Sequence, residues 1–300
     1  MRVKSSLLYV ALLATSALLL VLTVVFGALP MRVVRRAYGR GPFWLGYLAT
    51  SAGLLAAGMA PYGVILFAFA VLIGVYSEVE EHGGSAFASG MTAVLASVGT
   101  TVLVVGAWLY QTKASLIGVV RAELAPMAER MATLNPQSAM NLDQLVRMLP
   151  SGLVIMPILA LALAIAWESH LMKWLFRSET AEDSPKGMSA FRVPDAMVWV
   201  AIVAVFGAYF QHGINWLEVI SKNTLYVLVV VYFFQGLAVV SCAMRAWKVA
   251  PFWQGIWYFV LVVQLFILVS LVGFADYWLD FRERLLRKPP MQARRDSGSF

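Results

Sequence analysis

The sequence has 300 residues, 61% of them hydrophobic and only 13% charged, and its mean hydropathy of +0.77 excludes an ordinary soluble domain. The formal net charge of +7 is concentrated in short loops and the C-terminal tail, which suits membrane topology and lipid headgroup contact better than nucleic-acid binding. A single cysteine, Cys242, excludes an intramolecular disulfide, and the three histidines lie far apart, so we expect no metal site and no cofactor.

Long apolar runs predict an all-α protein, a polytopic transmembrane bundle of about eight helices. The predicted helices are 6–29, 43–59, 61–77, 86–110, 151–172, 196–210, 223–244 and 252–276. The first run is too long for a signal peptide, so we interpret it as an uncleaved transmembrane helix. The second and third runs meet at Ala60-Pro61, which leaves open whether 43–77 crosses the membrane twice. We expect residues 1–288 to form one transmembrane domain, followed by a disordered basic tail, 289–300.

A hydrophilic interval separates the fourth predicted helix from the fifth. Apolar residues recur there at helical spacing, which predicts an amphipathic interfacial segment over 114–148. With eight crossings the two termini share one side of the membrane. A slight excess of Lys and Arg on that side predicts that both termini are cytoplasmic.

The last apolar run ends in FADYWLDFRERLLRK, with Asp276 and Asp280 just before a block of arginines. Acid-before-base pairs four residues apart favour a helix leaving the membrane at the headgroup level. Asp276 lies deepest, and a charge at mid-membrane costs about 3 kcal/mol on insertion scales, so it is also a candidate ligand-binding residue.

Three more polar residues lie inside apolar runs and are candidate ligand-binding residues. Glu168 lies near the end of the fifth run, where an interfacial position is the competing interpretation. Gln235 and Gln264 are amides in the last two runs, where they would either bond across helices or line a polar cavity. No catalytic constellation and no nucleotide-binding motif is recognisable.

Three stretches carry a resemblance to a known family: MLPSGLVIMPILALALAIAWESHLMKWLFR (148–177), YFFQGLAVVSCAMRAW (232–247) and LVGFADYWLDFRERL (271–285). They resemble the YybS-like family, bacterial integral membrane proteins of unknown function. The family pattern falls on Pro150, Gln235, Gly236, Gly273, Asp276, Trp278, Asp280, Phe281 and Arg282. The resemblance implies a fold similar to the substrate-binding S components of energy-coupling-factor transporters, and more distantly to MreD-like cell-shape proteins. S components typically have about six helices, fewer than predicted here.

The resemblance and the polar candidates together favour a small-solute binding or transport component in the bacterial inner membrane, working with an energy-coupling partner. The alternative is an envelope or cell-shape assembly scaffold, with helix-packing rows of small residues at 49–60 as a docking surface. We expect no enzymatic activity, and we expect the lipid bilayer rather than nucleic acid as the chain's surroundings.

Overall fold

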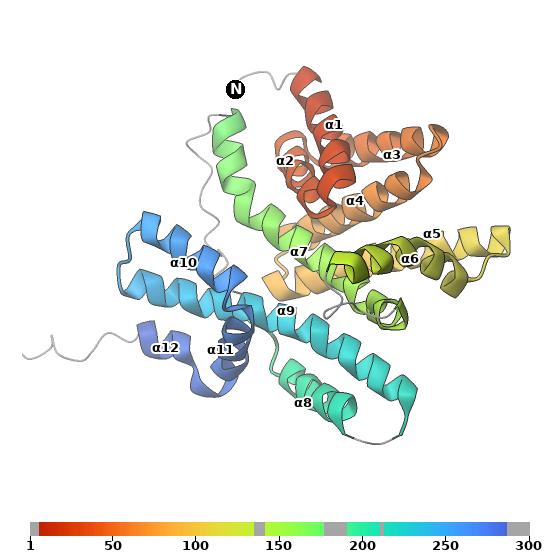
Figure 1. Cartoon of the computed structure of the whole chain (residues 1–300). Coiled ribbons are helices and arrows are strands. Elements are labelled where there is room, and N and C mark those ends of the chain that lie inside the picture. The colour runs from red at the N-terminus through yellow and green to blue at the C-terminus, as the bar shows by residue number, and fades with distance from the viewer. Residues whose placement is uncertain (1–5, 135–141, 177–190, 211–212, 287–300) are drawn as a thin grey trace, which may run out of the picture. The chain divides into compact units, whose positions relative to one another are not determined.

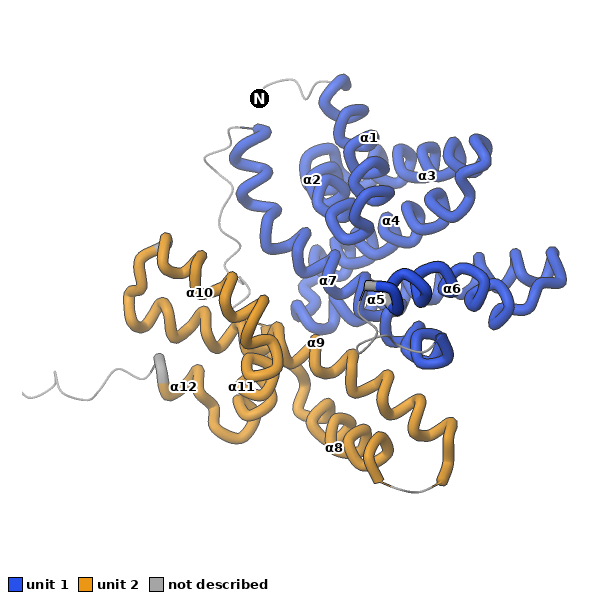
Figure 2. Tube along the Cα trace, viewed as in Figure 1, with its two compact units in different colours: residues 1–184 blue, residues 185–300 orange. Residues whose placement is uncertain are grey.

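The computed structural model describes residues 6–134, 142–176, 191–210 and 213–286, and these residues form twelve α-helices, one 3-10 turn and no strand (Figure 1). The all-α prediction is confirmed. The helices gather in two compact units, residues 1–184 and 185–300 (Figure 2). The predicted tail at 289–300 and the middle of the predicted amphipathic segment lie outside the described residues.

Unit 1 contains seven of the helices and the 3-10 turn, Val25–Gly27. The helices are α1 (Ser6–Thr23), α2 (Ala28–Tyr38), α3 (Arg40–Ala56), α4 (Ala60–Glu81), α5 (Ala86–Thr112), α6 (Leu116–Leu134) and α7 (Leu142–Phe176). The short helix α2 packs against α1, α4 and α7 (Figure 1), and nearly all of its residues are buried. Helices α1, α2, α4 and α7 all contribute to one apolar core. Helix α2, which carries three arginines, therefore lies within this core.

The first helix is shorter than predicted, because it ends at Thr23 and not at residue 29. Val24 has a φ of 55°, which reverses the chain into the 3-10 turn and then into α2. A Cβ at Gly27 would lie 2.8 Å from the Cβ of Leu20, so only glycine lets the chain pass this close to α1.

Helices α3 and α4 form a hairpin. Gly58, with a φ of 78°, lies in the turn between them, and a Cβ at Gly63 would lie 2.9 Å from the Ser51 carbonyl oxygen. The two helices therefore approach closely, as the break at Ala60-Pro61 indicates, with Pro61 in the first turn of α4.

Helix α7 begins nine residues before the predicted start at 151 and runs through Pro150 and Pro157. Proline removes a backbone donor, which normally ends or kinks a helix. The Ser151 hydroxyl donates to the Met148 carbonyl at 2.7 Å beside Pro150, and such side-chain bonds satisfy backbone groups near a proline in apolar helices. Pro150 thus lies inside a helix and not at its opening.

Unit 2 contains α8 (Ala196–Tyr209), α9 (Asn215–Ala246), α10 (Pro251–Val263), α11 (Phe266–Leu279) and α12 (Phe281–Leu286). Helix α9 is central, with α8, α11 and α12 packed against it (Figure 1). The prediction of a single helix over 252–276 is wrong, because the structure has two helices there, α10 and α11, with a bend of 97° between them. The break falls at Gln264 and Leu265, neither of which is a helix breaker by sequence.

Helices α9 and α11 cross with their backbones nearly touching. A Cβ at Gly236 would lie 2.0 Å from the Val269 carbonyl oxygen, and one at Gly273 would lie 2.0 Å from the Tyr232 carbonyl oxygen. Small residues allow this approach between apolar helices, where packing replaces the hydrophobic driving force. The crossing fixes the positions of the residues near each glycine.

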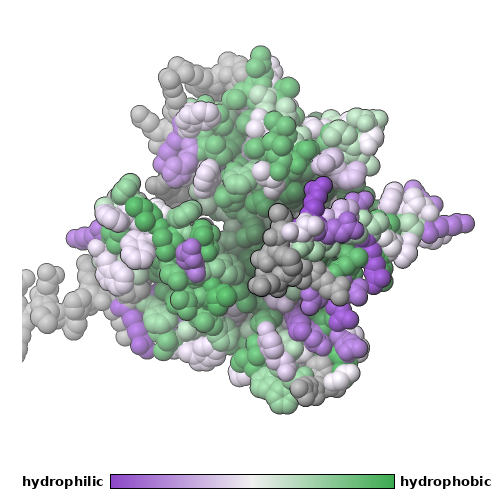
Figure 3. Space-filling view, viewed as in Figure 1, coloured by the Kyte–Doolittle hydropathy of each residue, from purple (hydrophilic) through white to green (hydrophobic). Residues whose placement is uncertain are grey.

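Among the described residues, five helices are long and apolar enough to cross a membrane: α1, α4, α5, α7 and α9. The bent pair α10 and α11 gives a sixth if it forms one span. This is fewer than the eight runs predicted, because α3 and α8 have only 17 and 14 residues. Many large apolar side chains are exposed on these helices, and apolar residues cover much of the visible surface (Figure 3). Such a surface suits lipid contact.

Candidate functional site

Asp276 lies at a buried polar cluster in unit 2. Its side chain in α11 accepts a bond from the Gln235 amide of α9 at 3.5 Å and pairs with Arg282 of α12 at 3.2 Å. Gln235 accepts the Val193 backbone N–H at 3.0 Å, and Arg282 donates to the Phe191 carbonyl at 2.7 Å. The cluster therefore connects residues 191–193, which precede α8, with helices α9, α11 and α12.

The glycine crossing explains why these groups meet. Gln235 precedes Gly236 on α9, and Asp276 follows Gly273 by three residues on α11, so the close approach places the two side chains together. Asp280 then has a φ of 41°, a left-handed conformation that aspartate tolerates better than most residues. That turn directs α12 back onto α9 and brings Arg282 to Asp276.

The other two candidate ligand-binding residues lie elsewhere. Gln264 is exposed at the break between α10 and α11. Glu168 belongs to unit 1, where its side chain is only 11% exposed and contacts arginines of α2. The structure therefore brings Gln235 and Asp276 together, and it leaves Gln264 and Glu168 outside that cluster.

The Glu168 cluster centres on Arg32, whose side chain is 1% exposed. Three different nitrogens of its guanidinium donate to Glu168 at 3.0 Å, to Ser77 at 2.7 Å and to Glu80 at 2.5 Å. The guanidinium carbon also lies 5.0 Å from the centre of the Tyr76 ring, within cation–π range. A planar fork with this many fixed donors is a property of arginine alone among the side chains.

Further ion pairs surround this centre. Arg36 also contacts Glu168, Arg35 bonds Glu81 at 2.9 Å, and Arg40 bonds Glu78 at 3.0 Å. Four arginines of the 32–40 stretch thus pair with four glutamates. The four positive charges of this cluster are therefore balanced by four negative charges.

Burial lowers the pKa of Arg32, but the carboxylates of Glu168 and Glu80 raise it by more, so this pKa lies above its ordinary value. Arg32 therefore stays charged at every physiological pH. Within the described ranges, no group of three His, Cys, Asp or Glu side chains is placed to hold a metal ion.

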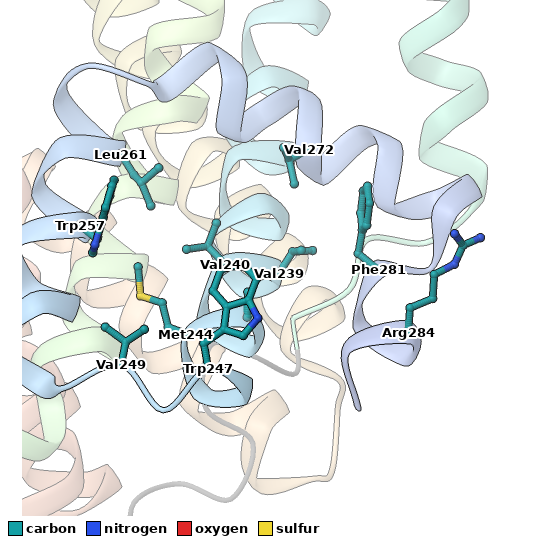
Figure 4. A pocket seen from close by; sticks show the side chains of 11 residues that line it. Val239, Val240, Met244, Trp247, Val249, Trp257, Leu261, Val272, Phe281 and Arg284 are labelled. Atoms are coloured by element: carbon teal, nitrogen blue, oxygen red, sulfur yellow. The ribbon is translucent and has the colours of Figure 1, made fainter. Parts of the chain in front are cut away.

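A cavity of about 710 Å³ opens elsewhere in unit 2, between the C-terminal half of α9 and helices α10, α11 and α12 (Figure 4). Its walls are formed by Val239, Val240, Ala243, Met244, Trp247, Val249, Trp257, Leu261, Val272, Phe281 and Arg284. Among the lining residues in the described part of the chain, Arg284 alone is charged. The cavity suits a hydrophobic molecule, and none of the predicted ligand-binding residues lines it.

The remaining residues of the family pattern frame this region. Gly236 and Gly273 form the helix crossing, Arg282 anchors α12, and Phe281 lines the cavity. Trp278 is exposed and stacks edge-on with Phe274, while Asp280 pairs with Arg192 at 3.6 Å. Eight of the nine pattern positions thus lie at 235–236 or within 273–282, on α9, α11 and α12 or at the turn between α11 and α12. Pro150 lies in unit 1, and both Pro150 and Trp278 are exposed.

Comparison with known proteins gives a family. Residues 5–277 match the family of predicted membrane proteins designated DUF2232. The chain belongs to the DUF2232 family. No curated protein and no solved structure matches it. Together with the apolar helices, membership makes this DUF2232 protein a multi-pass membrane protein in contact with the lipid bilayer.

Sequence reasoning missed two features of this DUF2232 protein. No site was predicted at Arg32, Arg35, Arg36 and Arg40 or at the acidic stretch SEVEEHGG, 77–84. The opposite charges of the four arginines and the three glutamates of this stretch were the signal that could have paired them. The cavity lining had no comparable signal, because Trp247, Trp257 and Arg284 resemble ordinary residues of a membrane interface.

Proposed function

We propose that this protein is a small-solute binding component of the bacterial plasma membrane, and that its solute is held in the cavity of unit 2. The cavity carries the proposal. Its volume of about 710 Å³ falls within the usual range of ligand sites, about 300–1,000 Å³, and such sites are mostly apolar.

The polar candidates support this function indirectly. Asp276, Gln235 and Arg282 hold α12 against α9, and Phe281 and Arg284 of α12 form one wall of the cavity. These polar groups are positioning residues for that wall. This differs from a polar cavity lined by the carboxylate and the amides themselves.

The resemblance to YybS-like proteins and to S components supports a role in transport. The sequence has no nucleotide-binding motif, so transport requires a membrane partner that supplies energy. Both termini are cytoplasmic in this proposal, so the partner meets the basic tail on that side.

The test is purification from native membranes in mild detergent, with mass spectrometry of retained small molecules and co-purifying proteins. Ala243→Trp places a large ring in the cavity, and Ala246→Trp adds the same ring at an exposed position outside the lining. We expect a stoichiometric small molecule with the wild type and Ala246→Trp, and its loss with Ala243→Trp. An ATPase pair among the proteins supports the transport role.

The alternative is an assembly scaffold, and one observation favours it. The small residues Ala49, Gly53 and Ala57 form a row near the end of α3 and are solvent- or lipid-exposed. Envelope-synthesis or cell-shape proteins in the purification, with no retained small molecule, would favour the scaffold over the solute-binding component.

A further inference from the structure

The cavity of unit 2 has a charge at one end only. In Figure 4 the side chains of Trp257 and Leu261 lie at one end of the view, and that of Arg284 lies at the other, beyond Phe281. The stretch between them is apolar, with Val239, Val240 and Met244 along it. A ligand that matches this lining has a hydrocarbon tail and a single anionic head.

Arg284 is available to such a head. Its side chain has no ion pair and no side-chain hydrogen bond within the described ranges, and only its backbone N–H bonds, to the Asp280 carbonyl. The nearby cation Arg282 is committed to Asp276, and the carboxylate of Asp280 faces Arg192. The guanidinium of Arg284 can therefore donate two parallel bonds to a phosphate, the geometry that arginine favours.

The position of the cavity along the helices points to a lipid. Its lining follows α9 to the end of that helix at Ala246 and continues into Trp247, which is 72% exposed. Tryptophan at the end of a membrane span marks the headgroup level. Arg284 lines the same cavity as Trp247, and the apolar lining extends from this level along α9.

We propose that the cavity binds an anionic membrane phospholipid, with an acyl chain between α9, α10 and α11 and the headgroup phosphate on Arg284. This rests on the proposed function, because it names the class of solute that the cavity holds. The Trp247 side chain covers the acyl chain near the headgroup. Phosphatidylglycerol meets the requirement, whereas phosphatidylcholine, with the same tails and a zwitterionic head, does not.

The experiment uses the full chain in vesicles of equal parts phosphatidylglycerol and phosphatidylcholine with identical acyl chains. The protein is extracted in mild detergent and washed, and the lipids retained per protein are counted by native mass spectrometry. The test variant is Arg284→Gln. The matched control is Arg245→Gln, which removes the same charge from an exposed side chain of unit 2 that does not line the cavity.

We expect the wild type and Arg245→Gln to retain phosphatidylglycerol in preference to phosphatidylcholine by about tenfold, the size of a charge-assisted contact at a partly exposed site. Arg284→Gln should reduce that preference to nearly one. Because Arg284 is exposed, the variant should keep the unfolding temperature of the wild type, which a thermal scan of the same samples checks.

Three other results would contradict the proposal in distinguishable ways. If Arg284→Gln keeps the preference while Ala243→Trp expels the lipid, the cavity holds a solute but does not recognise its head through Arg284. If the wild type retains both lipids equally and Ala243→Trp expels both, only the tail is bound. If Ala243→Trp retains as much lipid as the wild type, the lipid is annular only, and the solute-binding function fails with the inference.

Discussion

Replacing Arg32 by glutamine is the sharpest test of the arginine cluster in unit 1. The change removes the charge and leaves the carboxylate of Glu168, 11% exposed, without the cation that donates to it at 3.0 Å. Breaking a buried ion pair on one side costs about 3–5 kcal/mol. Because Glu80 is 35% exposed and keeps part of its solvation, and Arg36 still contacts Glu168, we expect the lower end of that range.

The assay is reversible unfolding in mixed micelles of mild detergent and dodecyl sulfate, followed by circular dichroism. A loss of about 3 kcal/mol changes the ratio of folded to unfolded protein by about a hundredfold, which shifts the unfolding midpoint clearly. The matched control is Arg40→Gln. Its guanidinium is 68% exposed and pairs with Glu78 at the edge of the same cluster, so its loss should cost less than about 1 kcal/mol.

Equal destabilisation by the two substitutions would refute the reasoning, because burial of Arg32 would then have no energetic consequence. A double variant adds a second check. Arg32→Gln with Glu168→Gln removes both charges, so the combined loss should be smaller than the sum of the single losses. A simple sum would show that the two side chains do not interact in solution.

Three further predictions concern the same clusters and the helix crossing. Arg32→Lys keeps the charge but lacks the three-way fork, so its stability should fall between that of the wild type and that of Arg32→Gln in the same assay. Gly236→Val places a side chain against a carbonyl of α11 and should prevent folding of unit 2, whereas Gly255→Val, in open space, should elute from size exclusion like the wild type. Asp276→Asn leaves Arg282 without its carboxylate and should lower the free energy of unfolding by about 2–3 kcal/mol. A double variant that also carries Arg282→Gln should regain part of the lost stability. If it regains none, the ion pair does not contribute to stability.

The polar cluster of unit 2 is the part of the site that the sequence indicates most directly, because its small and polar residues are near neighbours along each helix. Gly273 and Asp276 lie on one helix, and Gln235 and Gly236 on another, so one close crossing accounts for the cluster they form. Spacing along a helix is visible in the sequence, and the structure buries both Gln235 and Asp276.

Contacts over long separations were not predictable in this way. Arg32 and Glu168 are 136 residues apart, and nothing in either local pattern names the other as a partner. The bend between α10 and α11 was also hidden, because it occurs in an apolar run without glycine or proline at the break. Hydropathy reports the length of an apolar run and not its direction, so one run was taken for one helix.

The pairing of α2 with α4 and α7 also imposes an order on biosynthesis. The arginines of α2 leave the ribosome first, the glutamates at the end of α4 follow more than forty residues later, and Glu168 emerges 136 residues after Arg32. A buried arginine without a counterion is costly, so the apolar surroundings of Arg32 are unfavourable until these carboxylates exist. The ion pairing of Arg32 is therefore complete only after α7, which carries Glu168, has been synthesised.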